Sequence, residues 1–454
     1  MRPGAALGVL AAALALPACS SARDPGLPPN VVLIVVDTLR ADHLGCYGYA
    51  RSTSPRMDAF AAGATRYARA ISSGSWTVPS HASMFTGKAP FAHGAHDFPV
   101  ERERNNVRRL APEELTLAEA LSEQGYRTAA FAANAAFLAR HWQLDQGFER
   151  YQVERVFGDR LNPLIFRWLD GLDPAEPFFL FVNYIDTHGP FNADPRPEFD
   201  LGARADEGRL HDELALRVLP GVEPAPPDLV QRVIDQYDTA IANVDAAVGE
   251  LLDRLRPLED ASVVVVTSDH GHFFGEHALA KHSKDVYQEV LAVPLLVRAP
   301  GQREGRVEER VVASSDLPRL ILSHFPEPAR QGLLARFPEP GAGSLALAEN
   351  YYARPADLFH PVWGWRFRRV RRAVFEWPFK LIHSSDGQHE LYDLAADPAE
   401  AQDLYAERPE VAARLERALA EEIGDRQGPE GEGEPAELDP ELTRQLEALG
   451  YQGE

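Results

Sequence analysis

Five short apolar runs, separated by stretches with helical spacing, constrain the fold of this chain more than any other feature. The runs lack the alternation of a half-exposed strand, so each is expected to be a strand buried on both faces. They cover residues 31–36, 128–133, 178–184, 262–267 and 293–297. Helical patterns lie between them, notably at 115–124 and 229–255. Strands that alternate with helices predict an α/β fold with a doubly wound, mostly parallel sheet flanked by helices.

Polar residues follow four of these runs, at the point where each strand is expected to end. In chain order they are Asp37, Asn134, Asp186, His188, Asp269 and His270. Ligands of open α/β sheets bind at the carboxyl ends of the strands. The sequence therefore predicts one polar site along that edge of the sheet.

Asp37, Asp269 and His270 form a candidate ligand set for a divalent metal ion. Mixed oxygen and nitrogen ligands favour zinc or manganese, with calcium as a further possibility. Two simpler interpretations stay open at this stage. Asp37 could cap a helix after its strand, and His270 could be a hydrogen-bonded surface histidine.

A helix is predicted to begin near Thr77 and to end at Gly87, with Pro79 tolerated in its first turn. Thr77 is expected to cap it. A hydroxyl at a helix N-terminus lies where backbone N–H groups attract an oxyanion. If a metal ion also contacts Thr77, its alkoxide becomes accessible near neutral pH. Without the metal ligands, a role as a mere cap would be the better interpretation.

Several stretches in collinear order, over roughly residues 29–406, resemble the sulfatase family of the alkaline phosphatase superfamily. The stretch 31–49 is similar to the family's opening segment, 178–190 to its middle segment and 268–300 to its later metal segment. The segments around Lys380 and 390–398 resemble its C-terminal subdomain. The resemblance implies an alkaline-phosphatase-like α/β fold, ester hydrolysis, and His188 as the substrate-binding histidine.

The departures from the family pattern bear on mechanism. Formylglycine sulfatases carry a convertible Cys or Ser where this chain has Thr77, and an arginine where it has His81. Threonine cannot become formylglycine, whose hydrate releases sulfate by elimination. Thr38 replaces the second aspartate of the usual metal-ligand pair. The set resembles more closely the phosphodiesterases and phosphoethanolamine transferases that use threonine on zinc, and in the former an asparagine holds phosphoryl oxygens, a role open to Asn134.

Lys281 and Lys284 are two of the chain's four lysines and follow the metal segment directly. Such placement suggests a point-charge contact to a leaving-group or phosphoryl oxygen, with Lys284 or His188 assisting departure. The alternative is that both lysines are solvated surface residues. Asp186, His188 and His282 could complete a second metal site or contact substrate. Otherwise His188 is a substrate contact or general acid.

These features predict a metal-dependent hydrolase of phosphate or sulfate esters with Thr77 as nucleophile and phosphodiesters as favoured substrates. One alternative is a transferase of phosphoethanolamine or phosphoglycerol in the cell envelope. The others are a sulfuric ester hydrolase and an inactive homologue that binds anionic glycans. The formal charge of −22 argues against nucleic acid as a partner. The sequence does not predict the oligomeric state.

The segment before Cys19 is expected to be removed. Residues 5–16 are small and apolar but too short to span a bilayer, and the run ends in Leu-Pro-Ala-Cys. This resembles a bacterial lipoprotein signal, which implies export and a membrane anchor on a lipidated Cys19, facing the periplasm or in the outer membrane. An ordinary secretory signal is the alternative.

The expected organisation is a signal peptide at 1–18, a tether at 19–28, a catalytic α/β domain at 29–336, a C-terminal α+β subdomain at 337–424 and an acidic tail at 425–454. Strand patterns at 368–376, 379–384 and 389–394 predict an antiparallel sheet, and 409–422 a covering helix. With only two cysteines, a disulfide scaffold is excluded.

Overall fold

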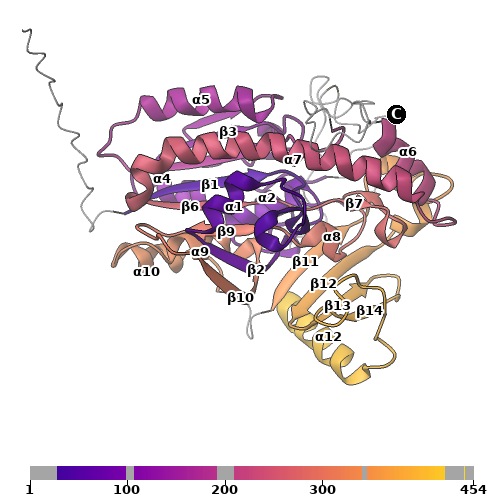
Figure 1. Cartoon of the computed structure of the whole chain (residues 1–454). Helices are drawn as coiled ribbons and strands as arrows, with labels where there is room; N and C mark the ends of the chain where they lie inside the picture. The colour runs from indigo at the N-terminus through magenta and orange to yellow at the C-terminus, as the bar shows by residue number, and fades with distance from the viewer. Residues whose placement is uncertain (1–27, 99–106, 192–208, 340–344, 425–443, 445–454) are drawn as a thin grey trace, which may run out of the picture.

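An eight-stranded sheet forms the centre of the computed structural model, which describes residues 28–98, 107–191, 209–339, 345–424 and 444 (Figure 1). The strand order is β10-β2-β9-β6-β1-β5-β3-β4. The bounds are β1 (Asn30–Val36), β2 (Thr65–Ile71), β3 (Arg127–Ala132), β4 (Arg150–Val153), β5 (Phe178–Tyr184), β6 (Ser262–Thr267), β9 (Leu295–Arg298) and β10 (Arg306–Ala313). The predicted doubly wound, mostly parallel sheet is confirmed.

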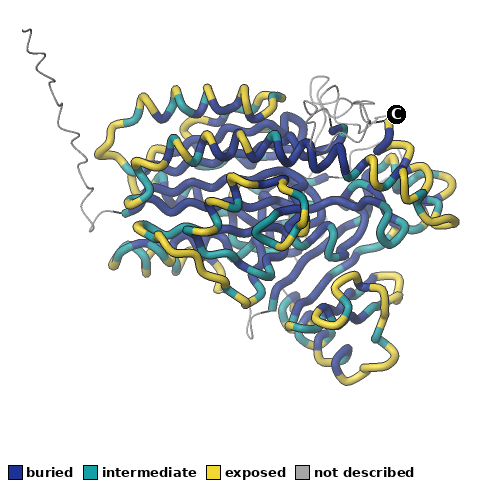
Figure 2. Tube along the Cα trace, in the orientation of Figure 1, coloured by how far each residue is buried: buried dark blue, intermediate teal, exposed yellow. Residues whose placement is uncertain are grey.

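Four adjacent strands, β6, β1, β5 and β3, run parallel and correspond to the first four apolar runs. All residues of β1, β5 and β6 are buried, as the lack of alternation predicts, and Figure 2 shows these strands in the interior. The fifth run forms β9, which pairs antiparallel with both β6 and β2. The edge strands β4 and β10 and the strand β2 next to β10 are not evident from the sequence because their residues are only partly buried.

Helices enclose the sheet in two layers (Figure 1). α7 packs against α1, α5 and α6, whereas α2 packs against α3, α4 and α9. The longer helices and those near the site are α1 (Pro55–Ala61), α2 (Thr77–Thr86), α3 (Pro90–His93), α4 (Leu117–Ser122), α5 (Gly158–Asp170), α6 (Arg209–Val218), α7 (Pro227–Leu255), α8 (Gln288–Leu291), α9 (Leu317–Leu322), α10 (Ala329–Leu334), α11 (Pro355–Leu358) and α12 (Pro409–Ile423). No helix within the described ranges combines the length and apolar character that a membrane crossing needs.

A second, four-stranded antiparallel sheet follows in the chain, with the order β11-β12-β13-β14. Its strands are β11 (Ala346–Tyr351), β12 (Val370–Glu376), β13 (Phe379–Ser384) and β14 (Glu390–Asp393), and α12 packs against β12 and β13. The predicted antiparallel sheet and covering helix are confirmed, with β11 as an additional strand. Its core, which includes Leu381 and Leu415, is separate from that of the large sheet.

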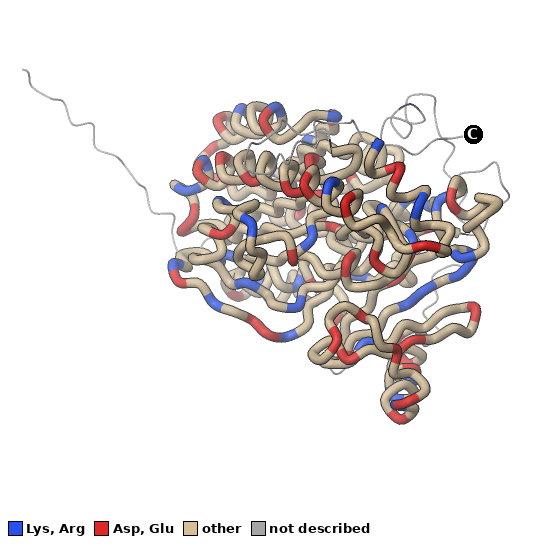
Figure 3. Tube along the Cα trace, turned by 45° about the vertical axis from the view of Figure 1, so that its right-hand side comes forward, with Lys and Arg blue, Asp and Glu red and all other residues tan. Residues whose placement is uncertain are grey.

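Basic and acidic residues are interspersed along the chain in the view of Figure 3. All four lysines are engaged in ion pairs: Lys88 with Glu114, Lys281 with Asp212, Lys284 with Asp357 and Lys380 with Glu400.

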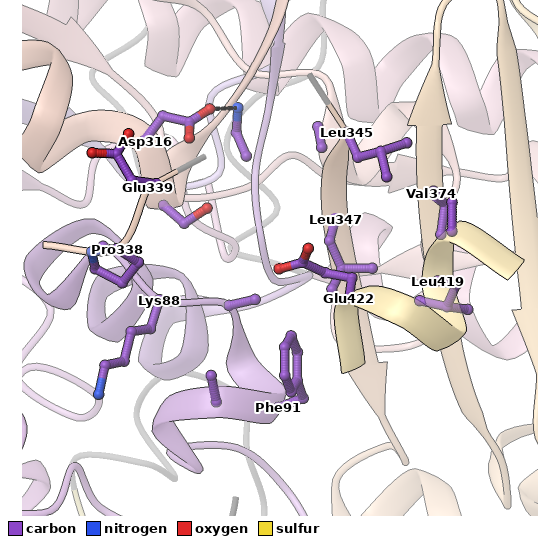
Figure 4. A pocket seen from close by; sticks show the side chains of 17 residues that line it. Lys88, Phe91, Asp316, Pro338, Glu339, Leu345, Leu347, Val374, Leu419 and Glu422 are labelled. Carbon is purple, nitrogen blue, oxygen red and sulfur yellow. Dashed lines mark hydrogen bonds between the residues drawn. The ribbon is translucent and has the colours of Figure 1, made fainter. Parts of the chain in front are cut away.

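A cavity of about 320 Å³ opens between α3, β11 and α12, with Phe91, Leu347 and Leu419 in its wall (Figure 4). Its lining includes none of the candidate site residues.

Candidate active site

The carboxyl ends of the central strands bring the predicted polar residues together. Asp37 follows β1 directly, Asp269 and His270 follow β6, and Asn134 follows β3. All four side chains are fully buried. β1 and β6 are neighbours, so Asp37 and Asp269 lie at the same edge of the sheet, as the sequence predicts.

Three ligand-type atoms converge at this edge. Asp37 Oδ1, Asp269 Oδ2 and His270 Nε2 lie within 4.8 Å of one another. His270 Nε2 is 3.8 Å from Asp37 Oδ1 and 3.4 Å from Asp269 Oδ2. Each of these atoms is buried and has no hydrogen-bond partner. Buried polar atoms without partners are costly unless an ion or water satisfies them, so this donor set fits a divalent cation.

The remaining atoms of the same side chains are all held by the protein. Asp269 Oδ1 accepts from the backbone N–H groups of Thr38 at 3.1 Å and His270 at 2.9 Å. Asp37 Oδ2 accepts from Asn134 Nδ2 at 2.8 Å. His270 Nδ1 donates to the carbonyl of Gly271 at 3.0 Å, which leaves the Nε2 lone pair facing the carboxylates.

The ionised forms of the two carboxylates are disfavoured when no cation neutralises them. Burial, followed by the charge of Asp269, raises the pKa of Asp37 to about 6. Burial raises the pKa of Asp269 to about 7, although hydrogen bonds from the backbone N–H groups of Thr38 and His270 oppose the rise. Burial also lowers the pKa of His270, which keeps its imidazole neutral and able to bind a metal.

Thr38 engages backbone carbonyl groups through its hydroxyl. Its φ of 60° places a β-branched residue in the left-handed region, where such residues are rare. Its hydroxyl donates to the backbone carbonyl of Thr187 at 2.6 Å. Thr38, which replaces the family's second aspartate, thereby connects the backbone that follows β1 to the backbone that follows β5.

Thr77 is the first residue of α2, and Trp76, not Thr77, occupies the N-cap position. The expectation that Thr77 caps the helix is therefore wrong, because its hydroxyl turns toward the strand ends instead of its own first turn. Asn134 Nδ2 lies 3.4 Å from Thr77 Oγ1 and also binds Asp37. The hydroxyl is thus next to the ligand atoms and at a helix N-terminus.

His81 lies one helical turn after Thr77, on the same side of α2. Its Nδ1 donates to the Thr77 carbonyl at 2.8 Å, and its Nε2 is buried without a partner. Burial lowers the pKa of His81 to about 3, so the ring is neutral. The position where sulfatases carry an arginine therefore brings no positive charge.

His188 and His282 form a buried pair beside His270. Their Nε2 atoms are 3.1 Å apart, and the ring of His282 lies 4.6 Å from that of His270. His188 Nδ1 donates to the carbonyl of Gly189 at 2.6 Å, so its Nε2 is the acceptor and His282 Nε2 the donor. Both neighbours of His282, Lys281 and Ser283, have φ above 60°. Strained backbone of this kind is concentrated at functional sites.

Two predicted site residues are engaged elsewhere. Both carboxylate oxygens of Asp186 lie 3.2 Å from the backbone nitrogen of Gly158, at the start of α5. This contact places Asp186 as an acidic partner of that helix N-terminus. Lys284 Nζ forms an ion pair with Asp357 at 2.7 Å and lies 3.3 Å from the carbonyl oxygen of His282. Lys284 therefore supports the backbone of the His188–His282 pair.

Sequence reasoning missed two features. His211 and His272 lie behind the pair, with their Nε2 atoms 2.5 Å apart, and no pattern links them because His211 comes from α6. Gly271 packs so closely that a Cβ atom would lie 2.1 Å from the carbonyl oxygen of Glu289. The Asp-His-Gly sequence was the available signal for this contact.

A doubly wound sheet with two carboxylates, an imidazole and a helix-terminal hydroxyl at one edge is an α/β fold with a site suited to ester hydrolysis. The comparison with protein families agrees: the family model "Sulfatase" matches residues 29–327. This chain belongs to the sulfatase family, whose members are ester hydrolases.

Curated relatives share this assignment. The Ulvan-active sulfatase of Formosa agariphila is 25% identical over 460 aligned residues, covering 89% of this chain and 83% of that protein. Arylsulfatase A of Homo sapiens is 37% identical over 131 residues, but covers 27% of this chain and 25% of its own. Among solved structures, phosphonate monoester hydrolase of Agrobacterium radiobacter superposes with a TM-score of 0.66 at 20% identity, covering 88% of this chain and 96% of that one. This likeness confirms the fold.

Proposed function

We propose that this chain is a metal-dependent ester hydrolase in which Thr77 is the nucleophile. The observation that carries the proposal is the convergence of the unpartnered atoms of Asp37, Asp269 and His270 beside the Thr77 hydroxyl. These four residues would hold one divalent ion, with zinc or manganese favoured by the mixed donors. When bound, the ion supplies charge neutralisation at a nonbridging oxygen and lowers the pKa of the hydroxyl.

The chain's own residues then divide the chemistry. Thr77 Oγ attacks phosphorus in line as the bond to the leaving alkoxide breaks, and the hydroxyl proton leaves to solvent water. The alkoxide takes a proton from a water molecule, and the neutral His188–His282 pair is placed to hydrogen-bond the leaving oxygen. Water then attacks phosphorus, the bond to Thr77 breaks, and the Thr77 oxygen regains a proton from the attacking water. Asn134, which lies between Asp37 and Thr77, orients the nucleophile and a phosphoryl oxygen.

The charge balance favours a substrate with one negative charge. A divalent ion balances Asp37 and Asp269, and His81 is neutral. Lys284 is already paired with Asp357. Sulfate monoesters and phosphodiesters carry a single charge, whereas phosphate monoesters carry up to two. Threonine lacks the elimination route of a formylglycine hydrate, so phosphodiesters are favoured over sulfate esters.

A sulfuric ester hydrolase is the second candidate, and the names of the relatives favour it. The Ulvan-active sulfatase is similar over 89% of this chain. Under this alternative, sulfate would have to leave Thr77 by direct attack of water. An inactive homologue that binds anionic glycans is disfavoured by the Thr77 hydroxyl beside the converging ligand atoms, because binding alone does not require a nucleophile.

We also propose that lipidated Cys19 anchors the protein in the bacterial cell envelope. The predicted tether of 19–28 reaches about 36 Å at most when fully extended, and it joins the amino end of β1. Asp37 lies at the opposite, carboxyl end of that strand.

A panel of matched aryl esters on one metal-loaded preparation tests the proposal. We expect kcat/KM to be highest for the phosphodiester, lower for the sulfate ester and lowest for the phosphate monoester. A preference for the sulfate ester would select the second candidate. Turnover that requires an added alcohol acceptor would select the transferase, and no turnover of any ester with metal bound would select the binding homologue.

A further inference from the structure

A second group of metal-ligand side chains lies outside the catalytic site. His277 comes from the loop before β8 (Ala280–Lys281), Glu289 from α8, and Glu400 from the segment between β14 and α12. One imidazole nitrogen and one oxygen of each carboxylate lie within 4.8 Å of one another. The two glutamates belong to different parts of the chain, so the group joins the catalytic sheet to the C-terminal sheet.

Like the catalytic ligands, this group contains buried ligand-type atoms without a hydrogen-bond partner. His277 Nε2 and Glu289 Oε2 are buried and form no hydrogen bond, and Glu400 Oε1 is held by an ion pair with Lys380. His277 Nε2 lies 3.5 Å from Glu289 Oε2. The side chains of Glu289 and Glu400 are 10% and 0% exposed. Two buried polar atoms without a hydrogen bond, beside a third carboxylate oxygen, need an explanation, and a bound cation is one.

We propose that His277, Glu289 and Glu400 bind a divalent cation, separate from the catalytic one, at the junction of the two sheets. One imidazole nitrogen and two carboxylate oxygens suit zinc or manganese, with water completing the coordination.

The neighbouring contacts hold these ligands in place. Glu400 Oε2 accepts from the backbone N–H of Gln288 at 2.6 Å, which directs its other oxygen toward the group. The Tyr287 ring stacks on His277 with centroids 3.7 Å apart. The backbone of Glu289 packs against Gly271 and accepts from His272 N at 3.1 Å. An ion bound here would therefore stabilise the backbone of Gly271 and His272, which follows His270 directly.

Lys380 provides the competing explanation. Its ammonium is fully buried and lies 2.6 Å from Glu400 Oε1, so protonated His277 with Glu289, and Lys380 with Glu400, would make two ion pairs. Binding of a cation displaces the proton from His277 and leaves Lys380 as a neighbour that weakens affinity. Lys380→Met should consequently tighten binding of the second cation, whereas two simple ion pairs would only lose stability.

The test measures zinc per chain in the full-length protein after equilibration with micromolar Zn²⁺ and gel filtration. We expect about two equivalents of zinc in the wild type. His277→Gln and Glu400→Gln should each keep about one, the catalytic zinc, and Asp269→Asn should instead lose the catalytic zinc and keep the second one. His383→Gln is the control, because His383 is a half-buried histidine of the C-terminal sheet outside the group. His282→Ala separates this site from a second metal at the His188–His282 pair.

A wild-type content of one equivalent that is lost in Asp269→Asn, or a second equivalent that survives His277→Gln, would overturn the proposal. Because His277 is less buried than Glu400, its variant is expected to fold even if Glu400→Gln does not. Failure here leaves the catalytic proposal untouched, since Asp269→Asn reports on that site independently. Co²⁺ substitution gives a readout that requires no activity. The d–d absorption of bound Co²⁺ should persist in Asp269→Asn and disappear in the double variant Asp269→Asn/His277→Gln.

Discussion

Asn134 donates its side-chain amide to Asp37 at 2.8 Å, across the strand β5 that separates β3 from β1. The bond occupies one carboxylate oxygen of Asp37 and leaves the other facing Asp269 and His270. The same amide lies 3.4 Å from Thr77 Oγ1. One asparagine thus orients both a metal ligand and the proposed nucleophile.

Removing that amide should shift the acidic limb of the pH–rate profile. The hydrogen bond lowers the pKa of Asp37 against the effect of burial, so Asn134→Ala should raise it above its present value of about 6. Asp37 must be ionised to hold a cation, and metal affinity and kcat/KM should therefore fall most near pH 6 and partly recover at pH 8. Superimposable acidic limbs for wild type and variant would contradict the role of Asn134.

The metal-free protein should lose stability as pH rises. The pKa values of Asp37 and Asp269 are raised from 3.8 to about 6 and about 7, so the folded state binds protons more tightly than the unfolded state. Their stabilising protonation is complete below pH 4 and is lost as pH rises through 6 to 7. Melting temperatures in chelator should fall across this window, and Zn²⁺ should restore them most above pH 7. Asp269→Asn should show a flatter dependence; an equally steep fall would reject the assignment.

Gly271→Ala should disrupt the site through the backbone. Its Cβ would meet the carbonyl oxygen of Glu289 at 2.1 Å, so the segment that carries His270 must move. We expect a loss of about 1–3 kcal/mol in unfolding free energy, together with weaker metal binding. Gly332→Ala is the matched control, since nothing lies within 4 Å of the added atom in α10. Equal denaturation midpoints for the two variants would contradict the packing argument.

The anchor can be tested by fractionation. Cys19→Ala should move the protein from the membrane to the soluble fraction, because acyl chains contribute about 0.8 kcal/mol per buried CH₂. Wild-type protein that is wholly soluble and begins at another residue would rule out lipidation.

The parts of the fold and site that follow buried strands were predictable. β1, β5 and β6 have uninterrupted apolar runs, and the polar residues after them meet because parallel strands end at one edge. The strand β2 was not predictable, since it is only partly buried and its residues do not alternate between buried and exposed. The antiparallel direction of β9 also depends on the path of the chain between β6 and β9, which local pattern does not encode.

Side-chain partners within the site were harder to predict. Asp186 and His188 are two residues apart, yet the first contacts the start of α5 and the second contacts His282. Lys284 follows the metal segment but is neutralised by Asp357, which is distant in sequence. Such pairings depend on tertiary contacts over tens of residues and carry no local signature.

The most direct test of the account compares wild type, Thr77→Ala and Thr77→Ser on an aryl phosphodiester at saturating zinc, with metal content measured on each sample. If Thr77 is the nucleophile, Thr77→Ala should lower kcat by about a thousandfold or more, while Thr77→Ser retains a part of the activity. Both variants should keep the wild-type far-ultraviolet spectrum. A metal-loaded Thr77→Ala enzyme with kcat within tenfold of the wild type would contradict the central claim.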